Sequence, residues 1–382
     1  MSSAWSLEKL HVEDILFTLG RPLSPIYGTI MSIRRNLYKR GILPSFSVKV
    51  PVISIGNILL GGTGKTPHVE MLTKWLLEKD IVPAIISRGY GGKVGKGPRL
   101  LFDGKKIHFG PDISGDEPYM MALNLKYYLK KKGLDRGPLI IIGSDRVSGA
   151  KEAIRYGAQT IILDDGFQHL RLKRDLDILL FPYNVSLNNL KIFPGGRLRE
   201  PISSLMDCDC IILTKCPDTI DEQIISALTP YCEAKSHFFS KYMSTSLEPL
   251  IEGQSYTLEY LRGKKVGVFS GIADPGSFES QLLSLGARIV GSQTYRDHYS
   301  YSYKDLLKLA KWAQSLGADL LLTTQKDLVK LRSILMHCPH DNSTPWPKIY
   351  ALAIEASVED GFFELIKKTL ERGVNVSNGT PE

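Results

Sequence analysis

The sequence predicts an α/β protein, with a mostly parallel sheet in a nucleotide-binding domain and a second, smaller α/β domain. Two observations lead to this fold class. Short apolar, β-branched segments alternate with stretches whose apolar residues recur at helical spacing, which is typical of βαβ units. One such segment, Val50 to Ile55, leads directly into the glycine-rich stretch Gly56 to Pro67, and a helical pattern follows over 69–77. Strand, glycine loop and helix in this order predict a phosphate-binding loop.

The predicted strands form two sets, separated by the polar and aromatic segment Ser236 to Tyr256. The first set would build a P-loop NTPase-like sheet and the second the smaller domain. The strands are expected at Val50–Ile55, Ala84–Ser87, Leu139–Gly143, Thr160–Asp164, Ile178–Phe181 and Cys210–Thr214, and then at Lys265–Ser270, Arg288–Gly291, Asp319–Thr323 and Lys348–Leu352. The expected division is an N-terminal helical segment (1–45), a P-loop domain (46–235), a linker or hinge (236–256), a smaller α/β domain (257–372) and a frayed tail (373–382).

The bulk composition limits the class of protein without selecting a function. A hydrophobic content of 43% supports buried cores, and a net charge of +8 suits an anionic substrate, an anionic membrane surface or nucleic acid. The five cysteines lack paired CxxC spacing, which predicts reduced, buried thiols in the cytoplasm. We expect neither a signal peptide nor a membrane-spanning helix, because no apolar run reaches roughly 18 residues.

A basic amphipathic helix is predicted near the N-terminus, over Pro25 to Arg40. Six apolar residues can share one side beside four cations: Ile26, Tyr27, Ile30, Ile33, Leu37 and Tyr38, with Arg34, Arg35, Lys39 and Arg40. Such a helix can lie in a headgroup layer, where each cation contributes about 1 kcal/mol near an anionic leaflet. The pattern alone fits equally well an ordinary helix packed on the domain with solvated charges.

The glycine loop contains the core of a nucleotide-binding motif, although the usual first glycine is out of place, at Gly56. The core reads Gly61, Gly62, Thr63, Gly64, Lys65, Thr66. Backbone N–H groups in such a loop form an anion cradle, and the positive end of the following helix adds to it. We expect this core to hold nucleotide phosphates, with Lys65 reaching the β- and γ-phosphates and Thr66 ligating Mg²⁺. The alternative is a tight strand–helix turn without a ligand.

Two adjacent carboxylates, Asp164 and Asp165, follow the predicted strand at 160–164 and precede a glycine. In P-loop proteins an acidic residue at the end of a neighbouring strand holds Mg²⁺ directly or through water. Adjacent carboxylates also suit a hard cation, whereas an Asp-Gly pair can simply form a turn. Beside the glycine loop, the pattern favours a magnesium site.

Other polar residues follow further strands or open helices. Asp116 stands at the predicted start of a helix, where a carboxylate is either an N-terminal cap or a general base for an incoming hydroxyl. The loop Pro194 to Pro201 carries two arginines that can clamp phosphates, together with Glu200. His298 lies beside Asp297, and an adjacent carboxylate can orient and charge an imidazole. A lone histidine is, however, more often structural than catalytic.

Nine segments of the chain, in order, read GNILLGGTGKTP, SRGYGG, GDEP, DDGFQH, GRLREP, LTK, GIADP, RDHYSY and TTQKD. Together they resemble the tetraacyldisaccharide 4′-kinase family, the lipid A 4′-kinases. The match runs from the N-terminal basic helix to about Leu331. One such segment is weak evidence, whereas nine in family order are highly specific.

The resemblance implies a peripheral enzyme at the cytoplasmic face of the bacterial inner membrane, acting in lipid A biosynthesis. It implies that ATP and Mg²⁺ are used to phosphorylate the 4′-hydroxyl of a lipid-linked disaccharide 1-phosphate. The expected partners are this lipid substrate and the anionic membrane surface, with no nucleic acid and no obligate protein partner. Two α/β domains joined by a hinge are also implied.

The resemblance further implies roles for single residues at matching positions. Lys65 and Thr66 match the phosphate loop, while Asp116 resembles the proposed general base and His298 its proposed partner. The carboxylates that match the metal site are Asp164, Asp165 and Glu200. Because Asp116 and His298 would lie in different domains, domain closure would be part of catalysis.

Three positions depart from the family pattern. Tyr299 stands where a second histidine is common, Asp274 where asparagine is common, and Gln325 where glutamate is common. Gln325 is expected to remove a charge that steadies Lys326. Two other functions fit the same P-loop motifs: a regulatory NTPase of the switch or metal-delivery type acting on a protein partner, and a cytosolic kinase of a soluble acceptor.

Overall fold

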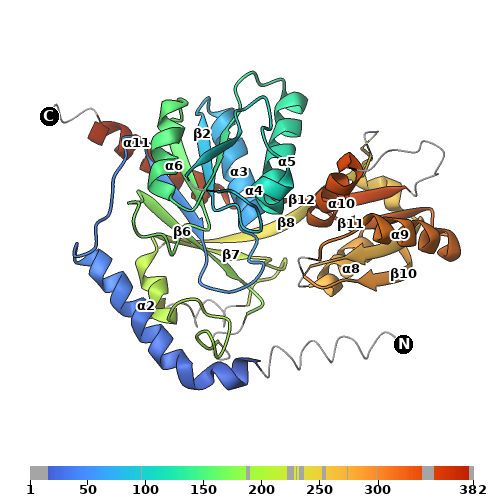
Figure 1. Cartoon of the computed structure of the whole chain (residues 1–382), viewed down its shortest axis with the longest axis horizontal. Coiled ribbons are helices and arrows are strands. Elements are labelled where there is room, and N and C mark those ends of the chain that lie inside the picture. The colour runs from blue at the N-terminus through green and yellow to red at the C-terminus, as the bar shows by residue number, and fades with distance from the viewer. Residues whose placement is uncertain are drawn as a thin grey trace.

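The computed structural model describes residues 16–95, 97–185, 190–221, 228, 230–231, 236–251, 255–272, 274–297, 299–337 and 348–377. Its named strands form one 12-stranded sheet in the order β10-β9-β11-β12-β8-β7-β6-β1-β5-β2-β4-β3. The sheet extends through two lobes, the first carrying β1 to β7 and the second β9 to β11 (Figure 1). The predicted α/β fold class is therefore confirmed.

The first lobe is a parallel sheet with one antiparallel edge strand, β3. Its strands are β1 (Val52–Gly56), β2 (Pro83–Ser87), β3 (Arg99–Phe102), β4 (Leu139–Ile142), β5 (Thr160–Asp164), β6 (Leu176–Pro182) and β7 (Cys210–Thr214). Its helices are α3 (Lys65–Glu78), α4 (Pro111–Ser114), α5 (Asp116–Lys132), α6 (Arg146–Arg155), η3 (Ile202–Asp207) and α11 (Asp360–Ser377). The six strands predicted for this lobe are all present: β5 and β7 have the predicted ends, and the ends of the other four are shifted by one or two residues. β3 was not predicted.

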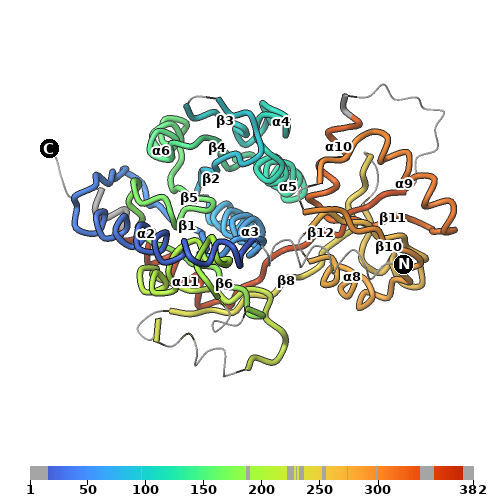
Figure 2. The backbone as a smooth tube through the Cα atoms, turned by 60° about the horizontal axis from the view of Figure 1, so that its bottom comes forward, coloured from blue at the N-terminus to red at the C-terminus, as the bar shows by residue number. Residues whose placement is uncertain are grey.

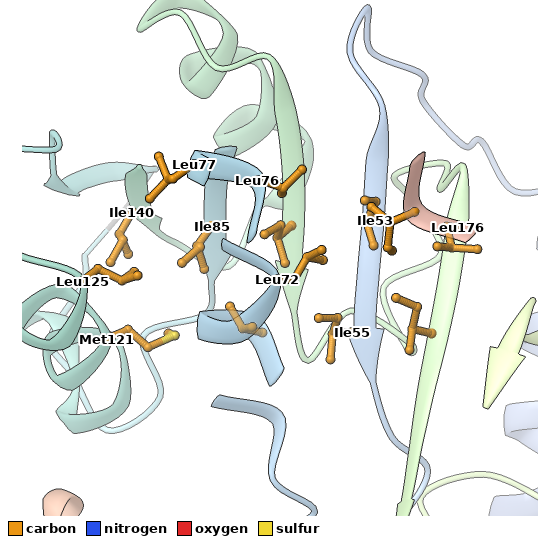
Figure 3. Packing of buried hydrophobic residues seen from close by; sticks show 14 of the residues in the cluster. Ile53, Ile55, Leu72, Leu76, Leu77, Ile85, Met121, Leu125, Ile140 and Leu176 are labelled. Atoms are coloured by element: carbon orange, nitrogen blue, oxygen red, sulfur yellow. The ribbon is translucent and has the colours of Figure 1, made fainter. Parts of the chain in front are cut away.

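Alternate residues of each central strand pack on opposite faces of the sheet. Ile53 and Ile55 of β1 are buried with Leu72 of α3 and Met121 of α5 (Figure 3). Phe362 of α11 belongs to the same cluster. Val52, on the other face of β1, is buried in a separate cluster that includes residues of α6. Both faces are covered, which explains the continuous apolar runs of these strands.

The second lobe is also parallel, with β9 (Lys265–Ser270) between β10 (Arg288–Thr294) and β11 (Leu320–Thr324). Its helices are η4 (Leu258–Leu261), α8 (Pro275–Ser284), α9 (Tyr303–Leu316) and α10 (Gln325–His337). Apolar side chains fill two clusters around this sheet. The strands predicted at Lys265–Ser270, Arg288–Gly291, Asp319–Thr323 and Lys348–Leu352 all fall on strands of the structure.

Two long antiparallel strands, β8 (Ser236–Pro249) and β12 (Ile349–Val358), join the lobes (Figure 2). β8 first pairs with β7 of the first lobe and then with β12, which pairs with β11 of the second. The sequence predicted no strand at β8, because β8 largely alternates between exposed and partly buried residues instead of forming an apolar run. α11 then packs in the core of the first lobe. The predicted domain boundaries, including the hinge at 236–256, stay a prediction.

An N-terminal helical segment lies along the first lobe, and its described part consists of helical residues 16–20, η1 (Arg21–Leu23) and α2 (Ser24–Lys39). Its outer side is apolar: Leu16, Leu19, Leu23, Ile26, Ile30 and Ile33 are each more than half exposed. Three of its cations instead face the protein. Arg35 pairs with Glu200, Arg34 donates to the carbonyl of Gln168, and Lys39 pairs with Asp207. None of the helices in the described ranges is both long and apolar enough to cross a bilayer.

Candidate active site

The candidate site lies where the parallel strands of the first lobe end. β1, β5, β2 and β4 are consecutive neighbours in the sheet, so their carboxyl ends share one edge. The glycine loop follows β1, the paired aspartates end β5, and Ser87 ends β2. Ligands bind at this edge in open parallel sheets.

The glycine loop has the form expected of a phosphate cradle. Gly64 takes a left-handed conformation, with a φ of 84°, and precedes Lys65, the first residue of α3. A side chain on Gly61 or Gly62 would meet nothing within 4 Å, so their backbone borders open space. Asn57 holds the intervening turn by donating to the hydroxyl of Thr63 at 2.6 Å. The open amides and the helix start together suit an anionic group.

The arginine-containing loop predicted from Pro194 to Pro201 closes against the start of the glycine loop. The Leu60 amide donates to the Arg197 carbonyl, and the Arg199 amide donates to the Ile58 carbonyl, both at 2.7 Å. These backbone bonds bring the Arg199 side chain beside the paired aspartates. The sequence predicted both loops as phosphate-binding candidates, but it contained no signal that they touch.

Asp165 connects the two cations of the site. Its Oδ2 accepts a hydrogen bond from Arg199 at 2.9 Å, and its Oδ1 lies 3.5 Å from the Lys65 ammonium nitrogen. Burial disfavours the charged carboxylate, but Lys65 and Arg199 outweigh it and lower the pKa of Asp165. The backbone at Asp165 has a φ of 54°, which is uncommon for a residue other than glycine. Such an outlier beside a candidate ligand site is consistent with a functional constraint.

Asp164 is more deeply buried and less readily ionised. Its Oδ2 accepts from the Ser87 hydroxyl at 2.8 Å. Burial, followed by the nearby charges of Glu117 and Asp165, raises the pKa of Asp164 to about 6. A buried carboxylate with a raised pKa beside a second carboxylate is a candidate functional-site residue.

Arg146, a residue that the sequence analysis did not single out, reaches the same edge from the start of α6. It is 4% exposed, donates to the Gly143 carbonyl, and has a buried Nε without a hydrogen-bond partner. Burial lowers its pKa, and the charges of Asp164 and Asp165 oppose that shift. The sequence signal that could have identified Arg146 is its position just after an apolar strand.

The donor set at this edge fits a hard divalent cation such as Mg²⁺. Thr66 is buried at the start of α3, and Oδ1 of Asp165 is buried without a hydrogen bond. Glu200 uses one oxygen to accept from Arg35 at 2.7 Å, while its buried Oε1 has no hydrogen-bond partner. Within the described ranges, however, no three His, Cys, Asp or Glu side chains gather around one metal position. The role of Glu200 as a metal ligand stays a prediction.

Asp116 and Glu117 open α5, where Gly115 and not Asp116 is the capping residue. Gly115 has a φ of 83°, and a Cβ there would lie 2.3 Å from the Tyr90 carbonyl oxygen. Only glycine permits this close approach, which fixes the helix start against the Ser87-Arg-Gly-Tyr-Gly-Gly92 loop. Asp116 lies 4.0 Å from Lys330 of the second lobe. His298 lies outside the described residues.

The three departures from the family pattern have separate structural settings. Tyr299 packs among Tyr295 and Tyr301, and Asp274 caps α8 by accepting from the Ser277 amide at 3.1 Å. Gln325 donates to Glu248 at 2.9 Å. Lys326 pairs with Glu117, so the described contacts give it a partner other than residue 325.

Comparison with known proteins finds relatives that share one family description. A family model described as Tetraacyldisaccharide-1-P 4′-kinase matches residues 16–371. A tetraacyldisaccharide 4′-kinase of Desulfotalea psychrophila is 37% identical, covering 94% of this chain and 97% of its own length. One from Geobacter metallireducens is 32% identical, covering 91% and 96%. A crystal structure titled as LpxK from Aquifex aeolicus in complex with ATP has a TM-score of 0.70 and 29% identity, covering 92% of this chain and 98% of its own.

Proposed function

The chain belongs to the tetraacyldisaccharide 4′-kinase family, and from this premise we propose that it transfers the γ-phosphate of ATP to the 4′-hydroxyl of a tetraacyldisaccharide 1-phosphate in lipid A biosynthesis. The observation that carries the proposal is the edge where the glycine loop, Lys65 and the paired aspartates meet. A phosphate cradle next to acidic residues on the neighbouring strand is the arrangement that P-loop phosphotransferases use.

The phosphates of ATP would be held by residues 61–66. The open amides of the loop and the positive end of α3 would bind the phosphate oxygens. Lys65 would exchange its contact with Asp165 for the β- and γ-phosphates, and Arg199 would stay near enough to compensate the transferring charge. Most of the rate enhancement would come from positioning and charge neutralisation.

Mg²⁺ would be held by the Thr66 hydroxyl and by the carboxylates Asp164, Asp165 and Glu200. When bound, Mg²⁺ neutralises negative charge on the β- and γ-phosphates. Glu200 Oε1 is buried and accepts no hydrogen bond, and Asp165 Oδ1 has only the 3.5 Å ion pair with Lys65. Both oxygens support this donor set, because buried carboxylate oxygens usually accept hydrogen bonds. Ser87 would keep Asp164 oriented through its hydrogen bond.

Asp116 would take the proton from the acceptor hydroxyl, with His298 as its partner. Two features support the choice of Asp116: it begins a helix beside the phosphate-binding edge, and it faces the second lobe. A carboxylate within reach of the acceptor hydroxyl can accept its proton, as a general base must. Reaction would then require both lobes to be in place.

The N-terminal helical segment would hold the enzyme on the cytoplasmic face of the inner membrane. Its apolar residues recur at spacings of three and four from Leu16 to Ile33 and lie on the outer side. A contiguous exposed apolar stripe of this kind is typical of an interface with a membrane or partner. A lipid-linked substrate favours the membrane.

One assay separates this function from its alternatives. Wild-type protein is incubated with γ-labelled ATP, Mg²⁺ and the lipid disaccharide 1-phosphate in mixed micelles, and label is followed in extracted lipid. Label in the lipid supports the 4′-kinase. Slow ATP hydrolysis that is stimulated only by an added partner protein would instead indicate the regulatory NTPase. Label in a water-soluble acceptor would indicate a cytosolic kinase.

A further inference from the structure

The second lobe contacts the first through an interface between α10 and α5. Val329 of α10 is buried in a small apolar cluster with Tyr119 and Met120 of α5. This contact lies within one helical turn of Asp116, the residue proposed as general base. The apolar cluster therefore brings the charged residues of α10 next to the start of α5.

Two lysines of α10 pair with the two carboxylates that open α5. Lys326 forms an ion pair with Glu117, and Lys330 Nζ lies 4.0 Å from Asp116 Oδ2. The lysines are four residues apart, so a straight helix presents both on one face. Glu117 and Asp116 are adjacent on the other helix, and the paired charges match across the interface.

Lys330 lies between carboxylates of both lobes. Its ammonium is 3.9 Å from Asp327 of its own helix, nearly the same distance as from Asp116. Its side chain is 10% exposed, so water screens these attractions weakly. Removing this charge would leave two neighbouring carboxylates without the cation that lies between them.

Asp327 ties the Lys330 ammonium to the sheet of the second lobe. Its Oδ2 accepts from the Gly271 amide at 3.0 Å and from the Thr324 hydroxyl at 2.8 Å, and its side chain is fully buried. Gly271 follows β9 and Thr324 ends β11, so Asp327 joins the strand ends of this lobe to α10. The position of Lys330 is thereby tied to the sheet and not to a loose surface helix.

We infer that Lys330 and Lys326 form a cross-lobe clamp that positions Asp116 for proton transfer, with Lys330 acting directly on Asp116 and Lys326 holding the adjacent Glu117. The inference rests on the proposed function, since it assigns the clamp to the base of that reaction. Both lysines are positioning residues. They fix the start of α5 relative to the second lobe, so that lobe placement and orientation of the base are set together.

The test is a double-mutant cycle between Lys330→Met and Asp116→Asn. In the wild-type background, Lys330→Met should lower kcat about 10- to 100-fold, the range expected when a base is misplaced by about an ångström. In the Asp116→Asn background the same change should cost less than about threefold, because the residue it positions is already disabled. The KM for ATP should stay within about twofold in both backgrounds. Lys330→Arg, which retains the charge, should recover part of the lost rate.

Lys308→Met is the matched control, because Lys308 is an exposed lysine of the same lobe that pairs only within α9 among the contacts described. Its kcat should match the wild type. If Lys330→Met impairs folding, as judged from its Tm, the cycle of Lys326→Gln with Glu117→Gln serves instead, since Lys326 is more exposed. That pair should also show non-additive losses in kcat.

Three results would overturn the clamp: equal fold-losses from Lys330→Met in both backgrounds, an unchanged kcat, or an increased kcat. The last would mean that Lys330 restrains the base. Failure of the proposed function is a different result, because wild-type protein would then put no label into the lipid. The clamp is judged only on variants that bind ATP as the wild type does.

Discussion

His68 of α3 and Ser240 of β8 are joined by a 2.8 Å hydrogen bond between Nε2 and Oγ. The other ring nitrogen, Nδ1, lies 2.8 Å from the carbonyl oxygen of Gly64. A carbonyl can only accept, so Nδ1 carries the proton and Nε2 accepts from the serine hydroxyl. The buried, neutral imidazole thus ties the end of the phosphate loop to the strand that runs between the lobes.

This linkage predicts a specific pH dependence of stability. Burial lowers the pKa of His68 to about 4, although the Gly64 bond opposes the shift. The pKa of His68 in the folded protein lies below its ordinary value of 6.5. The contribution of His68 to the free energy of unfolding is therefore complete above pH 6.5 and is lost as the pH falls towards 4. At about 1.4 kcal/mol for each pKa unit, the loss amounts to roughly 3 kcal/mol.

Denaturant unfolding between pH 4 and 8 checks this expectation in wild-type protein and His68→Asn, whose amide can still donate to Gly64. The free energy of unfolding should fall more steeply in the wild type below pH 6.5. His169, whose pKa burial also lowers to about 4, is present in both proteins and cancels in the difference. Parallel curves would show that His68 titrates normally.

The sequence was sufficient to predict strands and site residues where the local apolar pattern matches the burial of the segment. β5 and β7 were predicted with the observed ends, because both strands are buried along their whole length and read as apolar runs. The position of the paired aspartates beside the glycine loop also followed from the pattern, since motifs after neighbouring parallel strands meet at one edge. In these cases a residue's role depends on its own strand and on the adjacent one.

Non-local contacts were not predictable in the same way. β8 alternates between exposed and partly buried residues, because it lies in a ribbon between two lobes, and so it was read as a linker. The pairing of Lys326 with Glu117 joins residues 209 positions apart, and nothing in either segment indicates the other. The inward-facing Arg35 likewise depends on Glu200, whereas helical periodicity alone left it facing either a headgroup layer or solvent.

Replacing Asp116 by asparagine tests the proposed base. Turnover should fall by about 10²- to 10⁴-fold, the usual contribution of general-base catalysis. ATP affinity measured by calorimetry should be nearly unchanged, since Asp116 belongs to α5 and not to the phosphate loop. Asp112→Asn provides the control, because Asp112 is an exposed residue of the neighbouring α4. Equal turnover of Asp116→Asn and wild type would remove Asp116 from this role.

Replacing Thr66 by alanine tests the metal site. The variant should need a higher Mg²⁺ concentration for half-maximal activity, by at least about tenfold if the loss of one ligand costs about 1.4 kcal/mol. Thr73→Ala on the same helix is the control, because its hydroxyl donates to the Val69 carbonyl away from the phosphate loop. An unchanged metal requirement would count against Thr66 as a ligand.

The exposed side of α2 predicts membrane binding that depends on apolar contact. Ile26, Ile30 and Ile33 are 59%, 57% and 53% exposed, so inserting them into a bilayer would remove much apolar surface from water. Full burial of one such side chain is worth about 1.5–3 kcal/mol, and changing all three to serine should weaken binding to anionic vesicles at least about a hundredfold.

Vesicle sedimentation measures this change, with Leu283→Ser as a control for the loss of an exposed apolar side chain on the second lobe, since Leu283 is 55% exposed. The control should bind as the wild type does. Arg35 and Lys39 are paired with carboxylates of the first lobe, so the helix should keep its place on the protein when its outer side is made polar. The triple variant should therefore still bind nucleotide in solution while its binding to vesicles is lost. Undiminished sedimentation of the triple variant would assign the membrane contact to another surface.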